Sequence, residues 1–159
     1  MNRSPQRYKT LLRIRKQSED QEALKHAEAM RKVQNAQQER NELERYRSQV
    51  LDRAGKLLEQ NENPADLRAL YQYERHLALS ITDKDAMIIQ LKQSQQVQRE
   101  ELVNAMKQRR VIEQLMENLA AEEKEFQSKF EQKQMDEMNT MRAAFIGKKV
   151  QQRTGESHG

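Results

Sequence analysis

The sequence predicts an all-α fold, an antiparallel two-helix coiled-coil hairpin with an overhanging C-terminal helix. Residues 65–146 contain neither Gly nor Pro, and apolar residues recur there at alternating steps of three and four. An Asn-Pro pair at 63–64 separates this run from an earlier one, residues 6–54, that also lacks both residue types. The spacing is the heptad pattern of a coiled coil. At 1.5 Å per residue the second run alone would be about 120 Å long, so we expect a rod.

The first helix is predicted over about residues 6–58. Pro5 stands before it, and Gly55 is the first residue suited to stopping it. Its seam is rich in small and polar side chains, and we expect its arginines to run along the seam with their charged heads in water. The two series are Ala29, Ala36, Leu43, Val50 and Leu57, and His26, Val33, Arg40, Arg47 and Ala54.

A corner is predicted at residues 59–63. Asn63 is a good N-cap, Pro64 suits the first helical position, and Asp66 sets a carboxylate near the positive end of the helix dipole. A short corner makes the two helices antiparallel neighbours. Residue i of the first helix should then lie opposite roughly position 120 − i of the second. The N-terminal end of the first helix should therefore lie opposite about residue 115, and the second helix should continue beyond it.

The second helix is predicted over about residues 64–146. Two series spaced by seven run along it and are mostly apolar, although the chain is only 35% hydrophobic. This periodicity therefore indicates packing rather than background composition. The series are Leu70, Leu77, Lys84, Leu91, Gln98, Ala105, Ile112, Leu119 and Phe126, and Glu74, Ile81, Ile88, Gln95, Leu102, Arg109, Met116, Glu123 and Phe130.

The end of the second helix has no partner within the chain in this arrangement. It nevertheless keeps large apolar residues, the later ones shifted in phase, which indicates a local change in winding: Leu119, Phe126, Phe130, Met135, Met138, Met141 and Phe145. Such a stripe either pairs with another chain, a second copy included, or inserts into a groove or pore of a partner. Residues 147–159 are predicted to be a disordered basic tail, and residues 1–159 a single coiled-coil domain.

Composition excludes a broad globular core, because 34% of the residues are charged, 4% are aromatic and none is Trp or Cys. The absence of Cys fits a reducing cytoplasm, and no apolar stretch is long enough to span a membrane. The alternative of a disordered chain is opposed by the sustained heptads and by a net charge of only +4.

Motifs for catalysis are absent from the sequence. His26, His76 and His158 are isolated, and the glycines are single, so neither a metal cluster nor a phosphate loop is predicted. We expect a protein that is not an enzyme and that uses no metal or cofactor.

Charge is unevenly distributed. Residues 1–17 contain basic side chains and no acid, whereas residues 111–141 are mainly acidic. In an antiparallel hairpin these regions would meet, and their complementarity would set the orientation of the helices. Nucleic-acid binding is the alternative use of the basic residues, but no aromatic pattern accompanies them.

Four segments together resemble the FliJ family of flagellar type III export proteins. These are Leu11-Leu12-Arg13-Ile14-Arg15, Tyr46-Arg47-Ser48, the pair Tyr73 and Leu77, and Glu131-Gln132-Lys133-Gln134-Met135-Asp136-Glu137. The last segment is the most specific, and the resemblance covers nearly the whole chain.

The resemblance implies a stalk and general chaperone that works in flagellum biogenesis on the cytoplasmic side of the inner membrane. Its implied partners are a hexameric export ATPase, the cytoplasmic domain of the export gate and export chaperones. The implied gate contacts are Tyr46, Tyr73 and Leu77, although seam packing is an equal reading for Leu77. The implied ATPase contacts are Arg13, Arg15, Lys16, Phe126, Phe130, Met135, Met138 and Met141.

Glu39, Glu42 and Lys84 depart from the family pattern, since apolar, aromatic or His residues are expected there. Two other functions stay open at this point: the equivalent stalk of an injectisome, and a generic structural or nucleic-acid-binding coiled coil.

Overall fold

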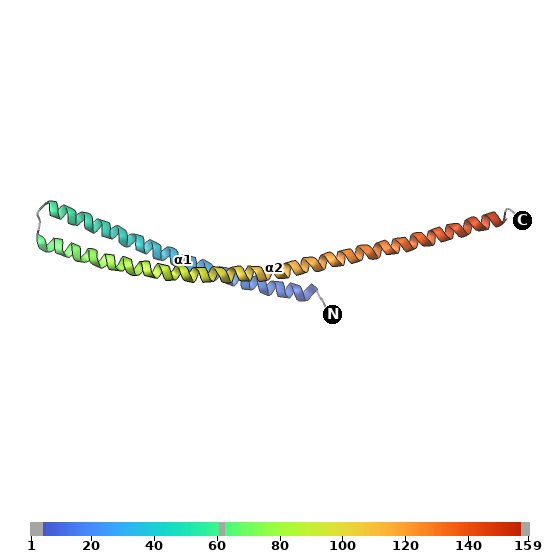
Figure 1. The fold of residues 1–159 in the computed structure, drawn as a ribbon, viewed down its shortest axis with the longest axis horizontal. Helices are drawn as coiled ribbons and strands as arrows, with labels where there is room; N and C mark the ends of the chain where they lie inside the picture. The colour runs from blue at the N-terminus through green and yellow to red at the C-terminus, as the bar shows by residue number, and fades with distance from the viewer. Residues whose placement is uncertain (1–4, 61–62, 157–159) are drawn as a thin grey trace. The chain divides into compact units, whose positions relative to one another are not determined.

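The computed structural model describes residues 5–60 and 63–156 of the chain. In these ranges it contains two helices, α1 (Pro5–Glu59) and α2 (Pro64–Glu156), and no strand (Figure 1). The two helices pack against each other, so the prediction of an all-α helical hairpin is confirmed.

Packing divides the chain into two compact units, where the sequence predicted one domain. The hairpin unit is residues 9–110. The terminal unit comprises the residues on both sides of it, of which the structure describes 5–8 and 111–156. Each unit is described by itself below.

The core of the hairpin unit follows the two heptad series of each helix. All of the predicted seam positions within it are buried or half-buried, whereas most of the intervening positions are exposed. The most deeply buried side chains, all apolar, are Val33, Ala36, Val50, Ala54, Leu77, Ile81, Ile88 and Ala105. Small residues such as Ala36 and Ala54 are among them, as expected for a seam rich in small side chains.

Charged residues at seam positions pair across the hairpin. Arg47 Nε donates to Glu74 Oε1 at 2.9 Å, and Arg40 Nε donates to Asp85 Oδ1 at 3.0 Å. Both arginine side chains stay partly exposed to water along the seam, and a carboxylate of α2 also lies within reach of each. Two further ion pairs, Glu39 with Lys84 and Glu19 with Arg109, link the helices.

The register of the hairpin agrees with expectation to within about two helical turns, both near the corner and at the distant Arg15–Gln108 hydrogen bond. Glu74, the partner of Arg47, lies next to position 120 − i, whereas Arg109, the partner of Glu19, lies about two turns beyond it. The offset arises in part because the break between the helices, residues 60–63, is centred slightly later than residue 60. The antiparallel pairing itself is as predicted.

Capping at the start of α2 also follows the prediction. The Asn63 side chain accepts a hydrogen bond from the Ala65 backbone N–H at 3.1 Å, and its carbonyl accepts one from Asp66 N–H at 3.2 Å. Pro64 is the first helical residue, where a missing N–H costs nothing. The rest of the predicted corner, at residues 61–62, lies outside the described residues.

The predicted end of the second helix needs correction. α1 passes Gly55 and ends at Glu59, close to the predicted end near residue 58, whereas α2 continues through Gly147 to Glu156, where the sequence predicts a disordered tail. The cost of one glycine inside a helix is only about 1 kcal/mol relative to Ala, and no proline lies within the four residues after either glycine. Residues 157–159 of the predicted tail lie outside the described residues.

Candidate binding surfaces

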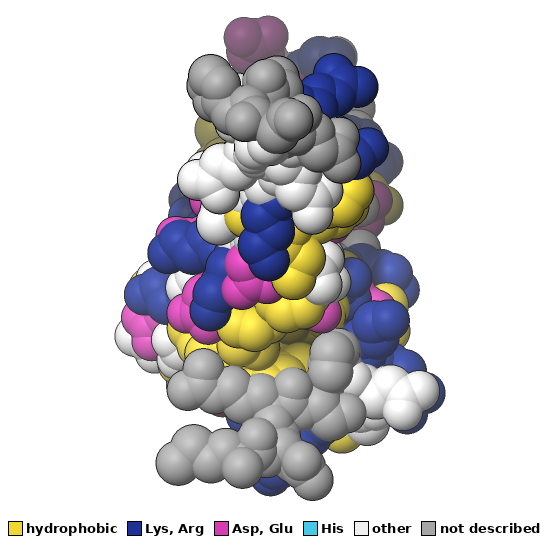
Figure 2. Space-filling view, turned by 90° about the vertical axis from the view of Figure 1, so that its right-hand side faces the viewer, with side chains coloured by type: hydrophobic (Ala, Val, Ile, Leu, Met, Phe, Trp, Pro, Cys, Tyr) yellow, Lys and Arg dark blue, Asp and Glu magenta, His cyan; other side chains and the backbone are white. Residues whose placement is uncertain are grey.

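The terminal unit exposes a row of large apolar side chains, which we call the apolar stripe. Side chains from residue 121 to residue 155 are all exposed. Phe126 is 71% exposed, and Met141 is 73% exposed. Apolar side chains at the surface beside acidic and basic ones are visible in Figure 2. The stripe consists of Phe126, Phe130, Met135, Met138, Met141 and Phe145.

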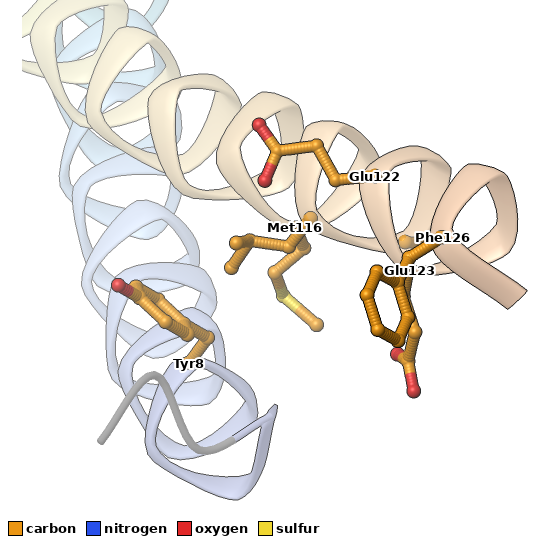
Figure 3. Close-up of a pocket in the computed structure, with 7 residues that line it drawn as sticks. Tyr8, Met116, Glu122, Glu123 and Phe126 are labelled. Carbon is orange, nitrogen blue, oxygen red and sulfur yellow. The ribbon is translucent and has the colours of Figure 1, made fainter. Parts of the chain in front are cut away.

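A groove of about 550 Å³ lies at the beginning of this stripe (Figure 3). Tyr8 of α1 lines one side of it, and Met116, Leu119 and Phe126 of α2 line the other, while Glu122 and Glu123 supply carboxylates. An apolar floor with an acidic rim suits an apolar side chain that is flanked by positive charge.

Tyr8 did not appear among the candidate residues predicted from sequence. The heptad series predicted for the seam of α1 begin at residue 26, although Tyr8 lies at heptad spacing before Arg15, Glu22 and Ala29. Extending the series backwards would have placed Tyr8 on the seam side of α1, where it is half-buried.

The three basic candidates for ATPase contact lie in the hairpin unit. Arg15 Nη1 donates a hydrogen bond to Gln108 Oε1 at 2.8 Å, so part of its donor capacity is used within the hairpin. Arg13 and Lys16 line a shallow depression together with Asp20 and are exposed. The apolar candidates belong to the terminal unit, so the two sets are considered separately.

Two tyrosines lie on one flank of the hairpin near the corner. Tyr46 and Tyr73 are each 49% exposed, and each directly precedes a member of the Arg47–Glu74 ion pair. In two antiparallel helices, the residues that precede facing seam positions turn to the same side. The pair therefore presents two half-exposed rings on a single surface.

Leu77 has a different environment from these tyrosines. Its side chain is 4% exposed and belongs to the core of the hairpin unit. Of the two roles considered for Leu77, burial favours seam packing, since a partner could not reach this side chain without opening the hairpin.

Two of the departures from the family pattern are partners of each other. Glu39 and Lys84 form an ion pair between α1 and α2. Lys84 occupies a seam position, so its charge needs an acidic partner, and Glu39 supplies one from the facing helix. The third departure, Glu42, is exposed.

Neither unit offers an obvious centre for chemistry in the part of the chain that the structure describes. No group of three or more His, Cys, Asp or Glu side chains there could hold a metal ion. No helix among the described residues is long and apolar enough to cross a membrane. What these surfaces can do is bind helices and apolar side chains.

Comparison with known families decides which kind of coiled coil this is. The family model of the flagellar FliJ protein matches residues 4–146. The chain belongs to the FliJ family. Membership identifies it as a component of flagellar type III protein export, which favours the flagellar system over the injectisome and over a generic coiled coil. No individual curated protein and no solved structure matched the chain.

The family match covers both candidate surfaces. The matched residues, 4–146, include Tyr46 and Tyr73 of the hairpin unit and the apolar stripe as far as Met141 and Phe145. Both surfaces therefore lie within the part of the chain that the family model matches.

Proposed function

We propose that this FliJ protein is a stalk that couples the flagellar export ATPase to the export gate and that also assists export chaperones. It acts in the cytoplasm, held at the inner membrane through these partners. No covalent step is involved: a rod with two binding surfaces works through its differential affinity for the conformations of two assemblies.

The observation that carries the proposal is the apolar stripe of the terminal unit. A helix in water that exposes three Phe and three Met side chains along such a stripe needs a partner, because contiguous exposed apolar surface of this kind marks an interaction site. In this proposal the helix enters the hexameric ATPase ring, which would take the stripe out of water. Phe126, Phe130, Met135, Met138 and Met141 would lie against the ring, and Arg13, Arg15 and Lys16 would meet acidic residues of it.

ATP hydrolysis tests this assignment. The export ATPase of the same organism is assayed with and without the full chain, and we expect stimulation. A variant carrying Phe126→Gln, Phe130→Gln and Met138→Gln should lose most of that stimulation while keeping its helical circular dichroism. Leu79→Gln is the matched control, since Leu79 is 67% exposed but lies in the hairpin unit. Equal stimulation by the triple variant and the wild type would refute the role of the stripe.

The gate is assigned to the flank that carries Tyr46 and Tyr73. We expect that Tyr46→Ala with Tyr73→Ala reduces retention of the full chain on the immobilised cytoplasmic domain of the gate. Tyr71→Ala is the control: this exposed tyrosine directly follows the seam residue Leu70, so it turns to the opposite flank of the hairpin. Loss of binding with Tyr71→Ala alone would place the gate contact on the other side.

A further inference from the structure

The charges along the second half of α2 are arranged in two opposite segments. The acidic segment, residues 113–125, holds Glu113, Glu117, Glu122, Glu123 and Glu125 against Lys124 alone. The basic segment, residues 142–153, holds Arg142, Lys148, Lys149 and Arg153 and no acid. Each segment also carries exposed apolar side chains. One helix therefore contains a surface and its electrostatic complement.

The two segments cannot satisfy each other within one chain. They belong to the same unbroken helix, and Glu123 and Lys149 are about 39 Å apart along its axis at 1.5 Å per residue. Ion pairs inside this region are local instead, as between Lys129 Nζ and Glu125 Oε1 at 3.2 Å, one turn apart and both exposed. Such a pair contributes only about 0.3–0.5 kcal/mol and does not prevent a second contact.

We propose that two copies of the chain pair through this region in an antiparallel, two-fold symmetric dimer. A two-fold axis near residues 133–134 places the acidic segment of each copy beside the basic segment of the other. The same complementary contact therefore occurs twice in the dimer. The same axis sets Phe126 and Phe130 of one copy opposite Met141 and Met138 of its partner. Charge and apolar pattern thus give the same register independently. A parallel dimer would set acid against acid and base against base.

The groove lined by Tyr8 lies at the end of this proposed contact. In the same register, the residues opposite Met116 and Leu119 are those of the basic segment that carries Phe145, Ile146 and Val150, each of them exposed in the single chain. The rim carboxylates of Glu122 and Glu123 then lie near Lys148 and Lys149 of the other copy. The groove receives an apolar side chain flanked by positive charge, which is the occupant that its lining favours.

This dimer is independent of the proposed function, although it covers part of the surface assigned there to the ATPase. The two would compete, so the dimer would keep the apolar stripe out of water until a ring is present. Its test uses the purified full chain alone, and therefore neither result depends on whether the ATPase assignment is correct.

Charge reversal with rescue is the decisive experiment. Sedimentation velocity over a wide concentration range should show a monomer–dimer equilibrium for the wild type. Glu117→Lys with Glu123→Lys, and separately Lys148→Glu with Lys149→Glu, should each weaken self-association about tenfold or more. An equimolar mixture of the two variants should restore dimers, because every reversed charge then meets an opposite one. Circular dichroism of each variant checks that the helices persist.

Orientation is tested by single cysteines, since the chain has none of its own. Gln134→Cys lies beside the axis and should form a disulfide-linked dimer on mild oxidation. Ala120→Cys should not, because its two copies would be about 40 Å apart in an antiparallel pair at 1.5 Å per residue. A wild type that stays monomeric at all concentrations, or equal cross-linking of both variants, would overturn the proposal.

Discussion

At the scale of single residues, the polar and small side chains of this coiled coil carry its specific geometry. Asn63 satisfies the first backbone donors of α2 with its side chain and its carbonyl. Gly55 lies inside α1 with open space where a Cβ would be. Both positions could be found in the sequence. Asn63 caps α2 as predicted, because an N-cap is a local interaction, and α1 passes Gly55 to end close to the predicted residue 58.

Asn63→Ala is expected to destabilise the protein by about 1 kcal/mol, since the Ala65 N–H would lose its side-chain acceptor. Chemical denaturation followed by circular dichroism measures the change. Asn63→Asp keeps an acceptor at the same position and should stay close to the wild type; a loss of similar size in both variants would mean that the cap is not the cause.

Gly55→Ala is expected to stabilise the protein by about 0.5–1 kcal/mol. Nothing lies within 4 Å of a Cβ built at this position, so the methyl group meets no obstacle, and alanine loses less conformational freedom on entering a helix. In a thermal unfolding experiment this should appear as a higher midpoint temperature. A lower midpoint would indicate that α1 really ends near Gly55 in solution.

At the scale of helices and their seam, the hairpin unit is held together by a narrow apolar core that polar seam residues interrupt. Among the described residues, three buried polar atoms lack a hydrogen-bond partner: Glu22 Oε2, His26 Nε2 and Gln98 Oε1. A buried acceptor without a partner costs about 1–3 kcal/mol. We therefore expect the seam around these three residues to be weaker than the corner end, where Val50, Ala54, Leu77 and Ile81 are buried.

Gln98→Leu is expected to raise stability by about 1 kcal/mol, because it replaces an unpaired buried carbonyl with apolar surface at a seam position. The measurement is the free energy of unfolding in urea. Gln96→Leu is the matched control on the exposed side of α2 and should change little. Destabilisation by Gln98→Leu would show that the amide has a role in the seam.

At the scale of the whole molecule, the buried core and the apolar stripe reside in different units. All of the buried hydrophobic residues belong to the hairpin unit, whereas the terminal unit exposes every described side chain from residue 121 onward. Side chains that bury little surface in the chain contribute little to its folding, so we expect this end of α2 to matter more for binding than for stability.

Removal of residues 121–159 should therefore leave the thermal midpoint of the dilute protein within about 2 °C of the full chain, because the deletion removes no buried contact. Calorimetry or circular dichroism measures it. The same deletion should abolish self-association and stimulation of the ATPase. A large drop in the midpoint would show that the end of α2 supports the hairpin.

The sequence by itself determined the helices, the break between them, the antiparallel pairing and the seam, because each follows from local chemistry or from heptad period. It also placed the apolar stripe. Only the tertiary structure decided which charged seam residues pair, that Leu77 is buried while Tyr46 and Tyr73 share an exposed flank, and that Tyr8 completes a groove. Those features depend on which residues of two distant segments face each other, and periodicity along one helix does not specify its partner's side chains.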